Sequence, residues 1–275
     1  MKTTLTVLGL ATILVLTVAG SVFAQPPGYA AEPGFKPGYT DTPLIPGSTW
    51  RVHDRDRPQP TYVTPGMGDL GATAPSDAVV LFDGKNLDKW VRTDGRPIAG
   101  GINDGILNIQ QSGQLRTKDE FGDFQLHVEW RTPAIKEGFE QGNQGNSGVV
   151  LMGTIEIQII ESYAVYNYAD GCAGAVYGQF PPLVNPSRKP LEWQSFDMFF
   201  TAPKFEGQTL KSQAIITLLF NGVLVQNQQH ILGPIRHRDV PGEYPVMEKG
   251  PLVLQYHNSP VEFRNIWIRP LTEKP

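Results

Sequence analysis

The chain has 275 residues, enough for one large domain or two small ones with a sizeable core. It carries 23 Lys and Arg against 27 Asp and Glu, for a formal net charge of -4. The basic residues are dispersed, which excludes a nucleic-acid surface built from a Lys/Arg stripe. A single cysteine, Cys172, excludes an intramolecular disulfide, and its Gly-rich surroundings favour a small structural residue over a nucleophile.

The first 24 residues have the pattern of a secretory signal peptide. Lys2 precedes an apolar run over residues 5–19, and Val22 and Ala24 are small residues at cleavage-site spacing. The run is short for a transmembrane anchor and no basic stop-transfer cluster follows it. No cysteine near Ala24 offers a lipid attachment point. We therefore expect an exported, soluble chain in the periplasm or outside the cell, with no membrane anchor.

Residues 25–75 are rich in proline and glycine and lack helical or strand periodicity, which predicts an extended arm or linker. Disordered spacers are poor in aromatic residues, whereas this segment contains Tyr29, Phe35, Tyr39, Trp50 and Tyr62. We expect part of the arm, residues 50–63, to pack on the folded body or on a partner subunit. Oligomerisation through the arm is therefore an expectation.

Residues 76–275 read as an all-β domain. Short runs rich in Val, Ile, Phe and Trp recur between glycine or proline turns, and no amphipathic helix pattern persists. The runs span residues 79–82, 106–109, 124–131, 195–202, 213–220, 223–226, 251–257 and 261–269, with an Asn221-Gly222 hairpin turn. About a dozen short antiparallel strands without helices predict a two-sheet sandwich or jelly roll.

Two strands have a polar face that could carry chemistry. In residues 155–159, Glu156 and Gln158 alternate with three isoleucines, so both project from one face. A half-exposed sheet would explain this pattern without a site. In residues 124–131, His127, Glu129 and Arg131 share a face opposite Phe124, Leu126, Val128 and Trp130. That row could grip a substrate carbonyl or form a cross-strand salt-bridge ladder.

Several ordered motifs resemble one family over most of residues 50–271. They include LFDGKNLDKW (81–90), GNSGVVLMG (145–153), IEIQIIESY (155–163), the stretch 168–203, and PLVLQYHNSPVEFRNIWIRPL (251–271). Together they resemble the family once listed as DUF1080 and now called 3-keto-disaccharide hydrolase. The resemblance implies a concanavalin A-like jelly roll, similar to laminin-G and glucanase domains, whose concave sheet binds sugars.

The resemblance also implies an exported enzyme that cleaves the glycosidic bond of 3-keto-glycosides or 3-keto-disaccharides. A ketone at carbon 3 acidifies the hydrogen on carbon 2, so a base can remove it and the group on carbon 1 leaves by elimination, with or without later addition of water. Such a site needs a base, donors or a cation at the carbonyl oxygen, and an acid for the leaving oxygen. A divalent metal ion is a candidate for the cation, with Glu156 and His257 as its candidate ligands.

The candidate catalytic residues are His257, Glu156 and Glu129. His257 is the leading candidate for base, because histidine titrates near neutrality; its alternative is a residue that caps a turn. The family commonly has an acid where this chain has Tyr256 and a glycine where it has Asn258. The candidate substrate-binding residues are Gln158, Arg131, Asn146, Glu161, Tyr177, Trp193 and Gln255.

Two other functions compete with the enzyme. A carbohydrate-binding module of the same fold would use the polar face without chemistry. An ordinary glycanase needs two catalytic carboxylates at a fixed separation. Strict alternation puts Glu156 and Glu161 on opposite faces, so we rank the glycanase last and the 3-keto-glycoside enzyme first.

Overall fold

The computed structural model describes residues 36–136 and 143–271. The predicted signal peptide, Tyr29 and Phe35 lie outside the described residues. In the described part of the chain, no helix is long and apolar enough to span a bilayer.

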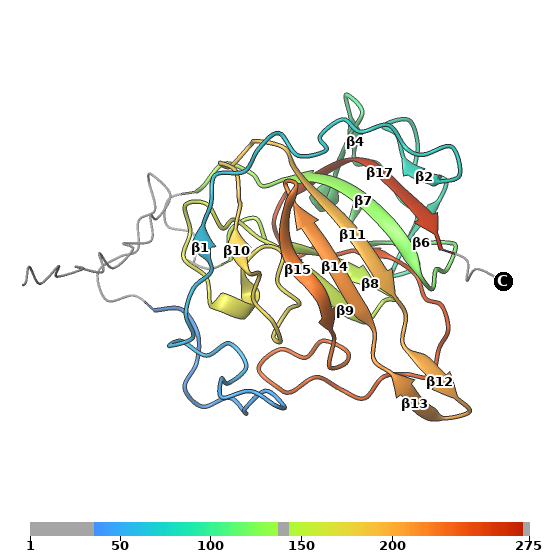
Figure 1. Cartoon of the computed structure of the whole chain (residues 1–275). Helices are drawn as coiled ribbons and strands as arrows, with labels where there is room; N and C mark the ends of the chain where they lie inside the picture. The colour runs from blue at the N-terminus through green and yellow to red at the C-terminus, as the bar shows by residue number, and fades with distance from the viewer. Residues whose placement is uncertain (1–35, 137–142, 272–275) are drawn as a thin grey trace, which may run out of the picture.

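The larger of two main sheets has eight strands, and all of its pairings are antiparallel (Figure 1). Its order is β15-β14-β11-β7-β17-β5-β4, and β2 pairs with β17 as well. The strands are β2 (Val79–Phe82), β4 (Ile102–Asn103), β5 (Ile106–Asn108), β7 (Phe124–Arg131), β11 (Gln194–Thr201), β14 (Ile215–Phe220), β15 (Val223–His230) and β17 (Glu262–Pro270).

The second sheet has five antiparallel strands in the order β3-β6-β16-β8-β9. They are β3 (Trp90–Arg92), β6 (Leu115–Thr117), β8 (Ser147–Leu151), β9 (Ile155–Ile159) and β16 (Val253–Leu254). A hairpin of β12 (Lys204–Glu206) and β13 (Thr209–Ser212) extends from the body, and β1 (Thr61–Tyr62) pairs with β10 (Val184–Asn185) in parallel. The chain is thus nearly all β, as predicted.

One hydrophobic core joins the two main sheets. The inward residues of β7 (Phe124, Leu126, Val128 and Trp130) are buried in it, as the alternation predicts. Ile155, Ile157 and Ile159 of β9 enter the same core from the other sheet. Because side chains alternate along a strand, Glu156 and Gln158 must then project from the opposite face of β9. That face carries the site.

The hairpin between β14 and β15 follows its sequence signature. Asn221 and Gly222 both have positive φ, at 51° and 77°. A two-residue type I′ turn needs this conformation at both positions, and Asn-Gly is the pair that adopts it most readily.

Three local features differ from the sequence prediction. A four-residue helix, α1 (Ile109–Ser112), replaces the expected strand end and turn, and the Asn108 side chain accepts from Gln110 N at 3.1 Å to cap it. A single 3-10 turn, η1 (Ala169–Gly171), lies in the Gly-rich segment. Within the expected strand 251–257, only Val253–Leu254 pairs as β16, so the residues that follow are released to the site.

The described part of the arm packs on the body of the same chain. Ile45, Val52 and His53 are buried. The Arg57 guanidinium donates to the Gln179 carbonyl at 3.0 Å. Strand β1 pairs with β10, so the expectation that residues 50–63 lie against the body is met within a single chain.

Candidate active site

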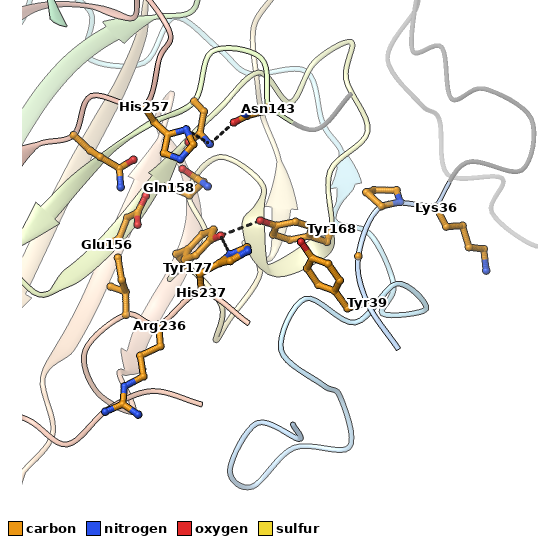
Figure 2. A pocket seen from close by; sticks show the side chains of 15 residues that line it. Lys36, Tyr39, Asn143, Glu156, Gln158, Tyr168, Tyr177, Arg236, His237 and His257 are labelled. Atoms are coloured by element: carbon orange, nitrogen blue, oxygen red, sulfur yellow. Dashed lines mark hydrogen bonds between the residues drawn. The ribbon is translucent and has the colours of Figure 1, made fainter. Parts of the chain in front are cut away.

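A cavity of about 570 Å³ opens on the polar face of β9, where the five-stranded sheet meets the arm (Figure 2). Its volume is in the range of small-molecule sites. One wall is polar and comes from β9 and its neighbours; the other is aromatic and comes from loops and the arm. The residues that carry these walls are Asn146, Glu156, Gln158, Gln255 and His257 on the first, and Tyr39, Tyr168, Tyr177 and His237 on the second.

The polar wall is built by strand alternation. Glu156 and Gln158 project from β9, and Gln255 follows β16, where its backbone N–H donates to Gly148 O at 2.9 Å. Asn146 directly precedes β8. The antiparallel pairing of β9, β8 and β16 therefore brings together side chains from three parts of the sequence.

Glu156 is the chemically distinctive group of this wall. It is 3% exposed, and burial raises the pKa of its carboxyl to about 8, although a hydrogen bond with Gln255 opposes the shift. Among the described residues, no cation is close enough to reverse this shift. The carboxyl is therefore mainly protonated at neutral pH and can donate a proton into the cavity.

Two amide oxygens beside Glu156 have no partner. Gln158 Oε1 and Gln255 Oε1 are buried and accept no hydrogen bond among the described residues. Buried polar atoms without partners are costly in a native protein. Hydroxyl groups of a bound sugar would supply the missing donors, so the amide pair fits a carbohydrate ligand.

His257 lies at the exposed rim of the same wall. Its Nδ1 is 3.4 Å from Asn146 Nδ2, and the Asn146 amide also donates to Asn143 Oδ1 at 2.6 Å. Figure 2 shows His257 and Gln158 among the residues that line the cavity. The structure thus brings five of the predicted site residues into one place: Glu156, Gln158, Asn146, Gln255 and His257.

Tyr177, the sixth predicted residue in the cavity, begins the aromatic wall. Its backbone N–H donates to Glu156 O at 3.1 Å, which places the ring beside the carboxyl. Its hydroxyl is 2.9 Å from Tyr168 Oη and 2.9 Å from His237 Nδ1. Burial raises the pKa of both tyrosines above the usual range and lowers the pKa of His237, so this chain of groups is neutral.

The fold and cavity can now be compared with known proteins. The family model described as "3-keto-alpha-glucoside-1,2-lyase-like domain" matches residues 77–269. The chain belongs to the 3-keto-alpha-glucoside-1,2-lyase-like family. The search of curated proteins returned no match.

Solved structures agree with this assignment. A "putative glycosyl hydrolase" from Parabacteroides distasonis ATCC 8503 is 36% identical, with a TM-score of 0.68 over 86% of this chain and 100% of that one. A second protein so described, from the same organism, is 19% identical with a TM-score of 0.51 over 71% of this chain and 94% of that one, and supports the fold alone. The lyase-like chain therefore has the fold of carbohydrate-active proteins.

The candidate catalytic residue Glu129 lies in the other sheet from Glu156 and does not line the cavity. It projects from the outer face of β7, where its carboxylate accepts from Gly71 N at 2.5 Å, Arg264 Nε at 2.6 Å and Asn265 Nδ2 at 2.8 Å. Burial opposes ionisation, but these bonds and one with His127 outweigh it and lower the pKa of Glu129 to about 2. This saturated carboxylate fastens the arm to the larger sheet.

Arg131 and Trp193 also lie outside the cavity of the lyase-like domain. Arg131 Nε is 2.5 Å from Glu262 Oε2, its partner across β7 and β17. The guanidinium groups of Arg131 and Arg264 lie over the Trp193 ring, at 4.7 and 4.1 Å from its centroid. Of the two readings of the β7 face, the cross-strand ladder is the one that the structure contains.

Glu161 and Cys172 are buried groups of the interior. The Glu161 carboxylate accepts from Thr132 Oγ1 at 2.8 Å and from Tyr163 N at 2.7 Å, which closes the turn after β9. It does not line the cavity. Burial raises the pKa of the Cys172 thiol to about 12, so the thiol is not poised as a nucleophile.

Acidic, histidine and cysteine side chains are dispersed in the described part of the chain. Within 36–136 and 143–271, no three His, Cys, Asp or Glu side chains gather closely enough to hold an ion. The candidate ligands Glu156 and His257 both line the cavity, beside the amide oxygens of Gln158 and Gln255. Carboxylate and amide oxygens are ligands that hard divalent cations prefer, so a divalent ion at this wall stays a prediction.

Sequence reasoning missed Tyr39, Tyr168, His237 and Gly148. The first three lie in the arm or in irregular loops, where no periodicity shows which way a side chain points. Gly148 lies in the GNSG motif (145–148), in which Asn146 was a candidate and the glycine was not. A Cβ at this position would lie 2.6 Å from Glu156 Oε1, so glycine leaves the room that the carboxyl occupies.

Proposed function

We propose that this protein cleaves the glycosidic bond of sugars that carry a ketone at carbon 3, by removing the carbon-2 proton and expelling the group on carbon 1. The family match supports a lyase-like carbohydrate enzyme, and the cavity supplies groups suited to this chemistry. The signal-peptide pattern supports action outside the cytoplasm.

One observation carries the proposal: Glu156 is the single carboxyl group among the described residues that line the cavity. A conventional glycosidase uses two carboxyl groups, about 5–5.5 Å apart when it retains configuration and about 6.5–9.5 Å apart when it inverts. Glu129 and Glu161 cannot supply the second group, because both are held in other parts of the fold. A ketone at carbon 3 removes that requirement, because it makes the carbon-2 hydrogen acidic.

For each step of this elimination, the polar wall offers a side chain that can carry it out. His257 accepts the carbon-2 proton, and the electrons of that C–H bond form an enolate with the carbon-3 carbonyl. Amide N–H groups of the wall stabilise the enolate oxygen. The enolate collapses to a carbon 1–carbon 2 double bond as the carbon 1–oxygen bond breaks, and protonated Glu156 gives its proton to the leaving oxygen.

Water can then add across the new double bond, with its hydroxyl going to carbon 1 and a proton to carbon 2, which completes a net hydrolysis. The two tyrosines and His237 of the aromatic wall are neutral, so they add no charge on that side of the cavity. Tyr177 lies beside Glu156 and is placed to contact the sugar or the leaving group.

The test is turnover of a 3-keto-glucoside with a chromogenic leaving group, run beside the unoxidised glucoside. The proposal predicts release from the keto compound and none from the glucoside. Release from both at similar rates would point to conventional glycosidase chemistry. Saturable binding of both without release would identify a carbohydrate-binding module of the same fold.

A further inference from the structure

The described arm contributes a buried histidine to the back of the cavity, although it precedes the family match that begins at residue 77. His53 is fully buried and lies in the segment between Gly38 and β1. Its backbone N–H donates to Asp170 Oδ2 at 2.9 Å, and its ring Nδ1 lies 3.0 Å from Asp170 Oδ1. A carboxylate only accepts, so Nδ1 carries the proton and the ring orientation is fixed.

Asp170 is itself held rigidly. It is fully buried in η1, between Tyr168 and Tyr177, and its carbonyl accepts from Gly178 N at 2.9 Å. The guanidinium of Arg57, also in the arm, is 3.8 Å from its carboxylate. Two residues of the arm thus converge on one carboxylate of the body, which sets the position of the arm.

The His53 ring supports the aromatic wall from behind. Its centroid is 4.1 Å from that of Tyr168, 4.8 Å from Tyr177 and 5.4 Å from His237. These are the three residues whose side chains form the chain of polar contacts at the cavity surface, seen in Figure 2 as dashed lines. His53 Nε2 is buried with no hydrogen-bond partner among the described residues, so the contacts of this ring with the wall are those between the rings.

His53 also holds the arm segment around Tyr39 in place. Its carbonyl accepts from Tyr39 N at 2.8 Å, and Tyr39 lines the cavity. Gly38 has a φ of 114°, and a Cβ there would lie 2.5 Å from His53 O, so the close crossing of the two arm segments requires glycine. Movement of His53 would therefore shift Tyr39 as well as the wall behind it.

We propose that the arm is a working part of the active site, and that His53, held by Asp170, is the positioning residue that fixes Tyr168, Tyr177 and His237 against the bound sugar. The kinetic test of this inference rests on the proposed function. The positioning of the aromatic wall by His53 does not, because it follows from the contacts of His53 alone. The alignment with the 36%-identical structure covers 86% of this chain and only residues 270–275 follow the family match, so that alignment extends into the arm.

The test compares His53→Asn with the wild-type exported chain. Asn Nδ2 can take the place of His Nδ1 and keep the bond to Asp170, while the part of the ring that packs on Tyr168 and Tyr177 is lost. We expect a cooperative melt and a fall in kcat/KM on the order of 10²-fold on the 3-keto-glucoside, because small displacements of site groups cost about that much. His230→Asn, the same change at an exposed histidine of β15 outside the cavity, should leave both unchanged.

A spectroscopic measurement separates positioning from general support. In ¹⁵N-histidine spectra of the wild type, His237 Nδ1 should show the shift of a nitrogen hydrogen-bonded to the Tyr177 hydroxyl, and His53→Asn should lose it. If a folded His53→Asn keeps this signal and the wild-type kcat/KM, the proposal is overturned. If His53→Asn does not fold, the same measurements are made on Asp170→Asn, in which the side chain keeps its volume. If the wild type turns over no keto sugar, the proposed function fails, and the His237 spectrum still decides the role of His53.

Discussion

Gly148 on β8 and Glu156 on β9 share one space: a Cβ on residue 148 would lie 2.6 Å from Glu156 Oε1 and 2.9 Å from its Cγ. The carboxyl of the cavity thus depends on a missing side chain in the neighbouring strand. Gly148 does not have a positive φ, so its backbone conformation is open to other residues. What glycine provides here is room.

Gly148→Ala should therefore inactivate the protein without unfolding it. The Glu156 side chain is the flexible partner and must move, and displacement of a proton donor by about 1 Å lowers kcat/KM on the order of 10²-fold. The check is kcat/KM together with a thermal melt. Gly66→Ala is the matched control, since no atom lies within 4 Å of its Cβ position; equal activity of both variants would show that Glu156 keeps its place.

The rate should fall at alkaline pH, because Glu156 acts in its protonated form and burial raises its pKa to about 8. Above that pH, kcat/KM is expected to decrease about tenfold per pH unit. Glu156→Gln should lose on the order of 10²–10⁴-fold in activity, the usual range for removal of a general acid or base, and its residual rate should lack this alkaline limb. A wild-type rate that rises through pH 8 would make Glu156 the base instead.

The same carboxyl should make stability depend on pH. The folded state keeps the Glu156 proton up to about pH 8, whereas the unfolded state releases it near 4.5. Between these values the unfolded state binds fewer protons, so the free energy of unfolding falls as pH rises, by up to about 1.4 kcal/mol per pH unit from this group. Denaturant titrations should show that the free energy of unfolding of Glu156→Gln rises relative to that of the wild type between pH 5 and 8. If the two free energies change in parallel with pH, burial does not raise the pKa of Glu156.

Glu129→Gln should destabilise the fold and leave catalysis per folded molecule unchanged. Burial opposes a charge on His127, but hydrogen bonds to Asp197 and Glu129 outweigh it and raise its pKa to about 9. Without the Glu129 charge, protonated His127 and Arg264 each lose an anionic partner, which should lower the free energy of unfolding by about 3–5 kcal/mol. Urea unfolding of the variant and the wild type measures this loss of stability.

Glu262→Gln is the matched control for that variant. Glu262 is paired with Arg131 on the same outer face but is half-buried, so its loss should cost less than about 1 kcal/mol. A stable Glu129→Gln with impaired kcat would return Glu129 to the list of catalytic groups.

Strand periodicity predicted correctly that Glu156 and Gln158 share the face of β9 opposite the core. The alternation of Glu156 and Gln158 with isoleucine held, and parity separated Glu161 from them. His257, which follows β16, was a candidate because histidine titrates near neutrality, and the resemblance to the family strengthened that prediction. Glu156 and Gln158 could be predicted because side chains alternate along a strand, so its sequence shows the two faces directly.

The alternation of residues along a strand does not show which of the two sheets the strand belongs to. Glu129 has the same alternating context as Glu156, yet β7 belongs to the larger sheet, and its outward carboxylate is covered by the arm at Gly71. Pairing between distant strands depends on the whole fold. For the same reason, the loop residue His237 and the arm residue His53 carried no local signal of their place at the cavity.

The most direct measurement of the central claim follows the carbon-2 hydrogen of a 3-keto-glucoside by NMR in heavy water, with wild type and Glu156→Gln in parallel. The wild type should release the leaving group with loss of the carbon-2 hydrogen, and Glu156→Gln should slow that release while keeping its fold. Release with the carbon-2 hydrogen fully retained would contradict elimination and would require a different chemistry in this cavity.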